Sequence, residues 1–236
     1  MTDNDFMGFV PSTGGKYECL PVGSYDYVIH GIVGLGLRPH SFEGKELKPH
    51  AVIKIIFEIP DSLREDGMTE LLSVKLPIST NEKSHFFKFC SVLLGASITN
   101  VAENMSRLCT ATGLKNLLGK TGTLTVSDWK SGEGRSVDRA GFHPLHPKAP
   151  VPVATRECIF FNPFSPDIDV FKNNLTFYTR KDIMEALNAD SFTDELKQAY
   201  QETLVEDAAN KVQAQAKAKA DTIEEASPWA TGESIQ

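Results

Sequence analysis

Alternating apolar and polar positions divide much of the chain into strand-like runs. The clearest run spans residues 51–60, where the two-residue period of a strand places Ile53, Ile55 and Phe57 on one face and Lys54 and Glu58 on the other. The first face is expected to be core, so Lys54 projects outward. Residues 24–37 and 70–79 have the same character, and residues 120–129 and 135–142 return to it later.

Between the third and fourth runs the spacing changes to that of helices. Over residues 82–118, Phe86, Phe89 and Cys90 recur on one helical face, and Gly95 ends the first helix. This aromatic stripe is expected to plug the end of a barrel rather than to bind a cofactor. The order of elements predicts a mainly β fold with helical additions: an oligonucleotide-binding (OB)-like five-stranded barrel with a helical insert between strands 3 and 4.

Composition shifts divide the rest of the chain. Residues 1–20 are expected to be a flexible N-terminal arm, and residues 21–145 the OB-like barrel. Prolines after residue 144 forbid helix and central strand, so residues 146–205 are predicted to be an extended connector and a C-terminal helical extension. Residues 206–236 are expected to form an Ala/Lys/Glu-rich helix and a disordered acidic tail.

The net charge of −7 argues against a uniformly basic binder of duplex DNA but leaves room for a local basic groove. No apolar run approaches the roughly 20 residues that a membrane span needs, and the N-terminus lacks the pattern of a signal peptide. A cytoplasmic protein is therefore expected. The four cysteines are widely spaced, which favours reduced, structural thiols.

No sequence pattern points to catalysis. Gly113 and Gly119-Lys120 resemble a phosphate-binding loop, but five residues separate the glycines where four are needed, and a strand follows where a helix is needed. His143 and His146 lie on a proline-rich segment without nearby cysteines or clustered acids, so solvated histidines are favoured over a metal site. We expect a non-enzymatic protein with no cofactor and no metal.

Cations and aromatic rings recur on the outward faces of strands and on loops. A single-strand binder needs this mixture, because cations follow the phosphates and flat rings stack on bases. The binding groove is expected to cross the outer face of the second, third and fourth strands, and residues 38–48 are expected to form a loop over it. An ordinary solvated surface is the alternative for each residue. The predicted DNA-binding residues are Arg38, Phe42, Lys45, Lys48, Lys54, Lys75, Trp129, Lys130, Arg135 and Arg139.

Five segments in order carry a family resemblance: LPVGSYDYVIHGIVGLG, HAVIKIIFEIPD, LPISTNEKSHFFKFCSVLLG, GLKNLLGKTGTLTV and NPFSPDIDVF. Across roughly residues 20–189 the chain resembles the single-stranded-DNA-binding-like proteins encoded in the replication and recombination modules of tailed bacteriophages. The resemblance implies an OB fold, sequence-independent binding of single-stranded DNA, and a role in phage DNA replication, recombination or repair in the host cell cytoplasm.

Such binders often end in an acidic tail with an aromatic residue that recruits replication or recombination proteins. The matching residues are Glu224, Glu225 and Trp229, although the acids are sparse and the chain ends in Gly-Glu-Ser-Ile-Gln. A homo-oligomer is compatible with this family. The alternative function is a phage structural or adaptor protein that uses the same barrel for protein–protein contact.

Overall fold

The computed structural model describes residues 20–42, 44–64, 66–95, 98–128 and 135–225. In this part of the chain, six strands form one sheet in the ladder order β3-β2-β1-β4-β5, with β6 paired to β1. Every ladder is antiparallel except that of β6 with β1. The expected mainly β fold is confirmed. The strands are β1 (Gly23–Phe42), β2 (Lys45–Leu63), β3 (Thr69–Pro77), β4 (Thr121–Asp128), β5 (Arg135–His143) and β6 (Ile159–Phe161).

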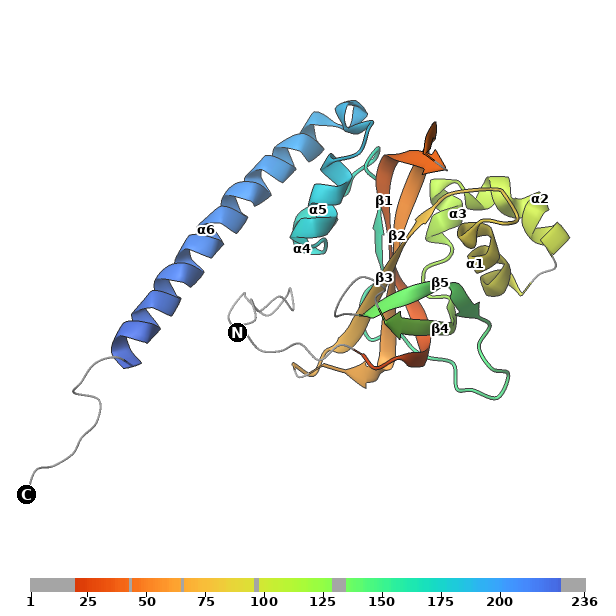
Figure 1. The fold of residues 1–236 in the computed structure, drawn as a ribbon, viewed down its shortest axis with the longest axis horizontal. Helices are drawn as coiled ribbons and strands as arrows, with labels where there is room; N and C mark the ends of the chain where they lie inside the picture. Colours follow the sequence, from red (N-terminus) through yellow and green to blue (C-terminus); the bar gives the residue numbers. More distant parts are fainter. Residues whose placement is uncertain (1–19, 43, 65, 96–97, 129–134, 226–236) are drawn as a thin grey trace, which may run out of the picture.

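The helices form two groups on opposite sides of the sheet (Figure 1). The predicted insert between β3 and β4 is confirmed as α1 (His85–Leu94), α2 (Ile98–Leu108) and α3 (Ala111–Lys115). The second group comprises α4 (Ile168–Asn173), α5 (Phe177–Met184), a 3₁₀ turn (Ala189–Ser191) and α6 (Asp194–Glu225), which extends away from the body. Helix α4 begins after Asp167, because the Asp167 side chain accepts a hydrogen bond from the Val170 amide at 3.0 Å and caps the helix.

Strand β1 changes which of its side chains face inward. Tyr27 and Ile29 face the core, but the register shifts between Ile29 and Gly31, and the next inward residue is Ile32, opposite Ile55. A bulge of one residue reverses the two faces of a strand, so Val33 then faces outward. Further register shifts follow between Gly34 and Leu37 and between Arg38 and His40.

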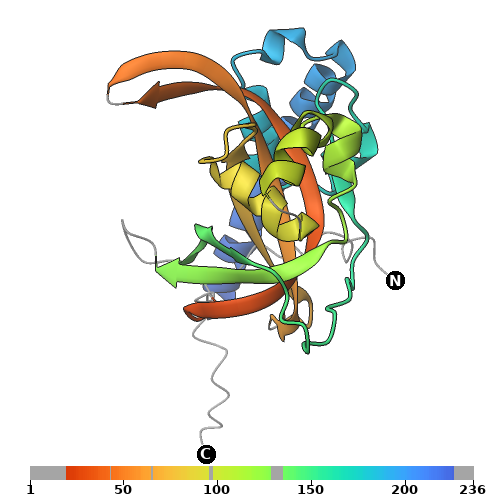
Figure 2. The same cartoon turned by 90° about the vertical axis from the view of Figure 1, so that its right-hand side faces the viewer.

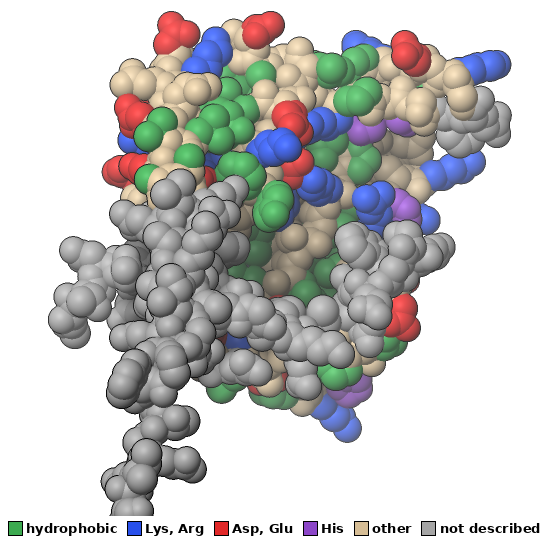
Figure 3. All heavy atoms as spheres, turned by 60° about the vertical axis from the view of Figure 1, so that its left-hand side comes forward, with side chains coloured by type: hydrophobic (Ala, Val, Ile, Leu, Met, Phe, Trp, Pro, Cys, Tyr) green, Lys and Arg blue, Asp and Glu red, His purple; other side chains and the backbone are tan. Residues whose placement is uncertain are grey.

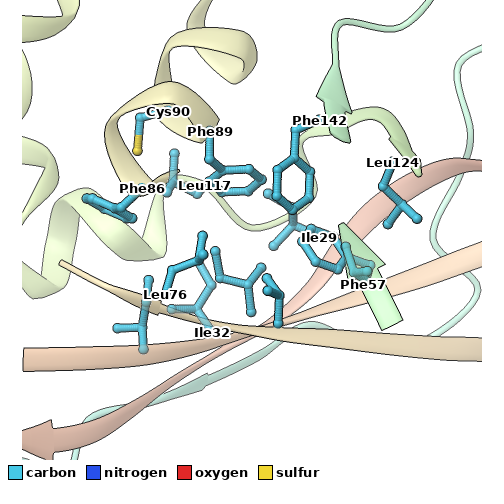
Figure 4. Packing of buried hydrophobic residues seen from close by; sticks show 14 of the residues in the cluster. Ile29, Ile32, Phe57, Leu76, Phe86, Phe89, Cys90, Leu117, Leu124 and Phe142 are labelled. Carbon is cyan, nitrogen blue, oxygen red and sulfur yellow. The ribbon is translucent and has the colours of Figure 1, made fainter. Parts of the chain in front are cut away.

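The first core lies between the sheet and the inserted helices. Four rings from four elements meet there, and Figure 4 labels three of them, Phe57, Phe89 and Phe142. The ring centroids of Tyr27 and Phe57 are 4.8 Å apart, those of Phe57 and Phe142 are 5.5 Å apart, and those of Phe89 and Phe142 are 4.8 Å apart. The predicted stripe on α1 is confirmed as core, because Phe86, Phe89 and Cys90 are fully buried. Edge-to-face and tilted ring pairs add to the stability that burial alone gives.

A second core lies on the outer face of β1 and β2. Outward-facing Val33, Leu35 and Val52 are buried against β6 and the C-terminal helices. The helices contribute mainly large apolar side chains to this core, namely Phe171, Leu175, Ile183, Phe192 and Leu196. The outer face of the sheet is therefore covered by α4, α5 and α6 over part of its area, where the sequence had suggested an open surface.

One buried arginine joins the C-terminal helices to one another. Arg180 of α5 donates hydrogen bonds to the Lys172 carbonyl at 2.9 Å and the Leu175 carbonyl at 3.0 Å, and it pairs with Asp207 of α6 at 3.1 Å. The first two contacts satisfy carbonyl groups at the end of α4, which otherwise have no helical partner. The three helices thus form one unit on β1.

A buried carboxylate holds the proline-rich connector against the sheet. Glu58 of β2 is fully buried and accepts hydrogen bonds from the Thr69 hydroxyl at 2.8 Å and from the amide and hydroxyl of Thr155. Burial raises the pKa of Glu58, but these hydrogen bonds and nearby His30 outweigh it and hold the pKa below its usual value. Arg156 completes the cluster by donating to the Thr69 hydroxyl and carbonyl.

A substitution at Gly36 measures how closely the unit formed by α4, α5 and α6 packs on β1. Its φ is +74°, and an added Cβ would lie 2.6 Å from the Ala186 Cβ and 2.8 Å from Asn188 Oδ1. Gly67 is a matched control, because its φ is +76° and nothing lies within 4 Å. Urea unfolding should show a loss of about 1–2 kcal/mol for Gly67→Ala. Gly36→Ala should lose about 1–3 kcal/mol more. Equal losses would mean that this contact is loose.

His30 should make the fold sensitive to mild acid. His30 is buried, and burial lowers its pKa below 6.5, although Glu58 opposes this and Arg156 adds to it. The unfolded chain therefore binds this proton first, so the stability contribution is complete above pH 6.5 and is lost as the pH falls through the folded-state value. His50 has a lowered pKa as well. Urea unfolding at several pH values should show a smaller loss below pH 6.5 in His30→Gln than in the parent; an unchanged slope would contradict this role.

Candidate functional site

Two hairpins project from the same side of the molecule (Figure 2). The first joins β1 to β2, and the second joins β4 to β5. Residues 38–48 were predicted to be a loop, but the strands continue through them to the pair Phe42 and Lys45. Pro39 and Pro49 are the reason that a loop was predicted here. Prolines suggest a loop, yet both lie where the ladder register shifts between Arg38 and His40, and a bulge needs no proline amide.

The first hairpin carries exposed positive charge. Lys45 and Lys48 are both exposed. The rings of His40 on β1 and His50 on β2 contact one another, with centroids 4.6 Å apart. Burial and the nearby His40 lower the pKa of His50. Of the predicted cations, Lys45 and Lys48 are therefore exposed on this hairpin.

Three more predicted cations meet on the outer face of neighbouring strands. Lys54 of β2 and Lys75 of β3 are direct partners in the ladder, and Arg38 of β1 reaches the same place. All three contact α5. Lys75 Nζ lies 2.6 Å from Asp182 Oδ2, and Arg38 Nη2 lies 3.9 Å from Asp182 Oδ1. The structure thus brings these three cations together, with Asp182 in their centre.

The three cations differ in how far their contacts within the fold leave them accessible to a ligand. Arg38 also donates to the backbone carbonyls of Asp182 and Glu185, so its guanidinium is used within the fold. Lys54 donates to Thr179 Oγ1 at 2.8 Å, and burial lowers its pKa, with Asp182 opposing and Lys75 adding to the effect. The Lys75 side chain is 49% exposed and remains open to solvent. We therefore regard Lys75 as the accessible member of the cluster.

The C-terminal helices are not a removable cover on this cluster. Phe171, Ile183 and Phe192 are each at most 3% exposed in the second core. Full burial of such a side chain contributes about 1.5–3 kcal/mol. A phosphate that competes only for partly exposed ion pairs, worth about 1 kcal/mol or less each, cannot displace that packing. A ligand must approach the cluster with α5 in place.

The remaining predicted residues divide into two sets. Arg139 of β5 is exposed. Trp129, Lys130 and Trp229 lie outside the described residues, and the side chains of Phe42, Arg135, Glu224 and Glu225 lie outside the described part as well. The structure therefore describes the side chains of six predicted residues: Arg38, Lys45, Lys48, Lys54, Lys75 and Arg139. Three of them, Arg38, Lys54 and Lys75, contact helix α5.

Sequence reasoning missed the α5 side of the site. Thr179 and Asp182 hold Lys54, Lys75 and Arg38, yet they lie more than a hundred residues further along the chain. The only signal in the sequence was the apolar character of both faces of β1, which indicates that each face is covered. It does not indicate which segment covers the outer face.

Figure 3 turns the side with α4, α5 and α6 forward, and it shows Lys and Arg side chains beside Asp and Glu side chains and around a hollow. Among the described residues, no group of three or more His, Cys, Asp or Glu side chains is placed to hold a metal ion. No helix in the described part of the chain combines the length and apolar character needed to cross a membrane. A scan against protein-family models and a search of curated proteins found no match to this chain.

Proposed function

We propose that this protein binds single-stranded DNA without sequence preference and catalyses no reaction. The observation that carries the proposal is the pair of hairpins that project to one side (Figure 2), with accessible cations on and near them. Lys45 and Lys48 are on the first hairpin, Arg139 is on β5, and Lys75 is on the strand at the edge of the ladder path. This arrangement offers several phosphate contacts to one flexible strand.

We also propose that the sheet is an OB-type barrel. Three strands, a helical insert and two strands follow one another, and β1 pairs with β4 through its first part and with β2 through the rest. The two ends of the ladder path, β3 and β5, approach one another. In OB folds the face of strands 2 and 3 and the loops joining strands 1–2 and 4–5 bind oligonucleotides. Lys45, Lys48 and Lys75 belong to those same elements, and Arg139 lies on the strand that follows the 4–5 loop.

The proposed DNA path follows the edge of the sheet at β3 rather than its middle, where α5 covers the outer face. Arg38 and Lys54 are occupied by α5, so they support the path indirectly, while the exposed edge of β3 and the hairpins contact the strand. Ser73 and Lys75 are outward, exposed residues of β3. We place the DNA over this edge, between the hairpins.

The biological setting rests on the family resemblance. We propose service in phage DNA replication, recombination or repair, with the tail residues Glu224, Glu225 and Trp229 as a contact for partner proteins. The alternative, a structural or adaptor protein that holds another protein with the same sheet, would show no affinity for oligonucleotides and would co-purify with phage particles.

Oligonucleotide binding and its salt dependence test the proposal directly. Fluorescence anisotropy with labelled oligo-dT should show binding at low salt that weakens as salt rises, because phosphate neutralisation releases counterions. The double variant Lys45→Ala/Lys48→Ala should reduce the magnitude of the logarithmic salt slope by about 1.4, at roughly 0.7 for each single-strand phosphate contact.

The matched control is Lys83→Ala/Lys88→Ala, which removes two exposed lysines at the helical insert and should leave the slope unchanged. If the folded parent protein does not bind oligo-dT at low salt, the proposed function is wrong. If both double variants lose the same slope, binding is diffuse and does not follow the hairpin.

Trp129 follows the last residue of β4 in the sequence and gives an optical test of the second hairpin. The chain has two tryptophans, so Trp229→Phe isolates the signal of Trp129. In that background oligo-dT should quench the fluorescence if the indole stacks on a base. Trp129→Ala should then weaken binding by about 1–3 kcal/mol. Unchanged fluorescence and affinity would remove Trp129 from the interface.

A further inference from the structure

Helix α5 exposes a tyrosine beside the cation cluster. The Tyr178 side chain is 73% exposed, although tyrosine rings gain stability from burial and Ile183, near the end of the same helix, is fully buried. Tyr178 and Asp182 are four residues apart on α5, so they share one face of the helix and are separated by about one turn, or ~5.4 Å. Helical spacing therefore places Tyr178 on the side of α5 that also carries Asp182, the partner of Lys75.

The helical segment that carries this ring is anchored by contacts on each side of Tyr178. Thr179 accepts a hydrogen bond from Lys54 Nζ at 2.8 Å, which anchors the start of α5 over β2. Asp182 pairs with Lys75 at 2.6 Å, which anchors the next turn over β3. The Tyr178 ring also lies edge-on to Phe177, with centroids 5.5 Å apart. A ring held in this way can accept a partner with little further loss of conformational freedom.

We propose that Tyr178 is a stacking platform for one base of single-stranded DNA, and that Lys75 contacts the phosphate next to that base. The inference deepens the proposed function and rests on it. Three cations surround one carboxylate in this cluster, so Asp182 leaves an excess of positive charge beside the ring. An exposed ring next to an accessible cation matches the two parts of a nucleotide, and stacking on a tyrosine tolerates any base.

Phe164 provides a matched comparison within the same C-terminal unit. It is the other strongly exposed aromatic side chain among the described residues, at 55%. Its ring packs edge-on against Phe192, with centroids 5.4 Å apart. The proposal assigns base stacking to Tyr178 and none to Phe164.

Paired oligonucleotides separate stacking from charge. Anisotropy titrations should use oligo-dT and an abasic oligonucleotide of the same length, which keeps the phosphates and lacks the bases. Tyr178→Ala should bind oligo-dT at least about fivefold more weakly than the parent and should bind the abasic strand as the parent does. Tyr178→Phe should retain parent affinity, and Phe164→Ala should leave both affinities unchanged. Lys75→Gln should lower the salt slope, whereas Tyr178→Ala should not.

The outcomes distinguish this inference from the proposed function. If the parent protein binds oligo-dT and Tyr178→Ala binds it equally well, the inference is wrong and the proposed function stands. An equal loss for oligo-dT and the abasic strand also overturns it, because the tyrosine would then act through the fold. If the parent binds neither strand, both the proposed function and the inference are wrong. Thermal unfolding of each variant identifies misfolded protein. If Tyr178→Ala is destabilised, the oligo-dT affinity of Tyr178→Phe, which keeps an aromatic ring, is compared with that of the parent protein.

Discussion

The structure depends on β1 contributing side chains to two cores at once. Tyr27, Ile29 and Ile32 point into the core under the inserted helices, whereas Val33 and Leu35 point into the core under the C-terminal helices. One register shift near Gly31 makes both possible, because it changes which residues face inward. A strictly alternating β1 would turn Val33 toward the first core and deprive the C-terminal unit of its contact with the sheet.

Covering the outer face has an electrostatic consequence. Lys54 faces the side of the sheet on which α5 packs, and its ladder partner Lys75 adds a second charge nearby. Two adjacent ammonium groups next to a guanidinium would repel one another, and desolvation would raise the cost. Asp182 and Thr179 relieve this, and in doing so they fix the direction of α5 over three strands. The same contacts that secure the helix therefore set the chemistry of the adjacent surface.

The local patterns of the sequence predicted the parts of the fold that depend on neighbouring residues. The inward face of β2, with Ile53, Ile55 and Phe57, follows from its two-residue period, and the buried stripe on α1 follows from helical spacing. The length of the first hairpin could not be predicted in this way. Its prolines lie in an irregular part of the ladder, and the tolerance of a bulge for proline depends on the partner strand.

Only the strand residues of the candidate site could be predicted from the sequence. Lysine and arginine positions on the strands could be assigned to an outward face, because strand parity is local. The acid and hydroxyl that hold them belong to a distant helix, and no pattern in the sequence connects Asp182 to Lys75. Long-range pairing of this kind is set by how the two cores close, so it follows from the tertiary structure. The same applies to Tyr178, whose sequence context gives no indication that its helix packs against the strand of Lys75.

The net charge of −7 and a polyanionic ligand are compatible because charge acts locally in salt solution. At physiological ionic strength exposed charges are screened beyond about 8 Å, so a phosphate on Lys75 responds to Asp182 and the nearby cations far more than to distant acids. Asp182 is held there by α5 and cannot leave. Under the proposed function it would weaken each phosphate contact at this cluster while it keeps the Lys75 ammonium in place. Under the proposed function, stacking must then supply much of the affinity at this point, because it is the term that a fixed carboxylate does not oppose.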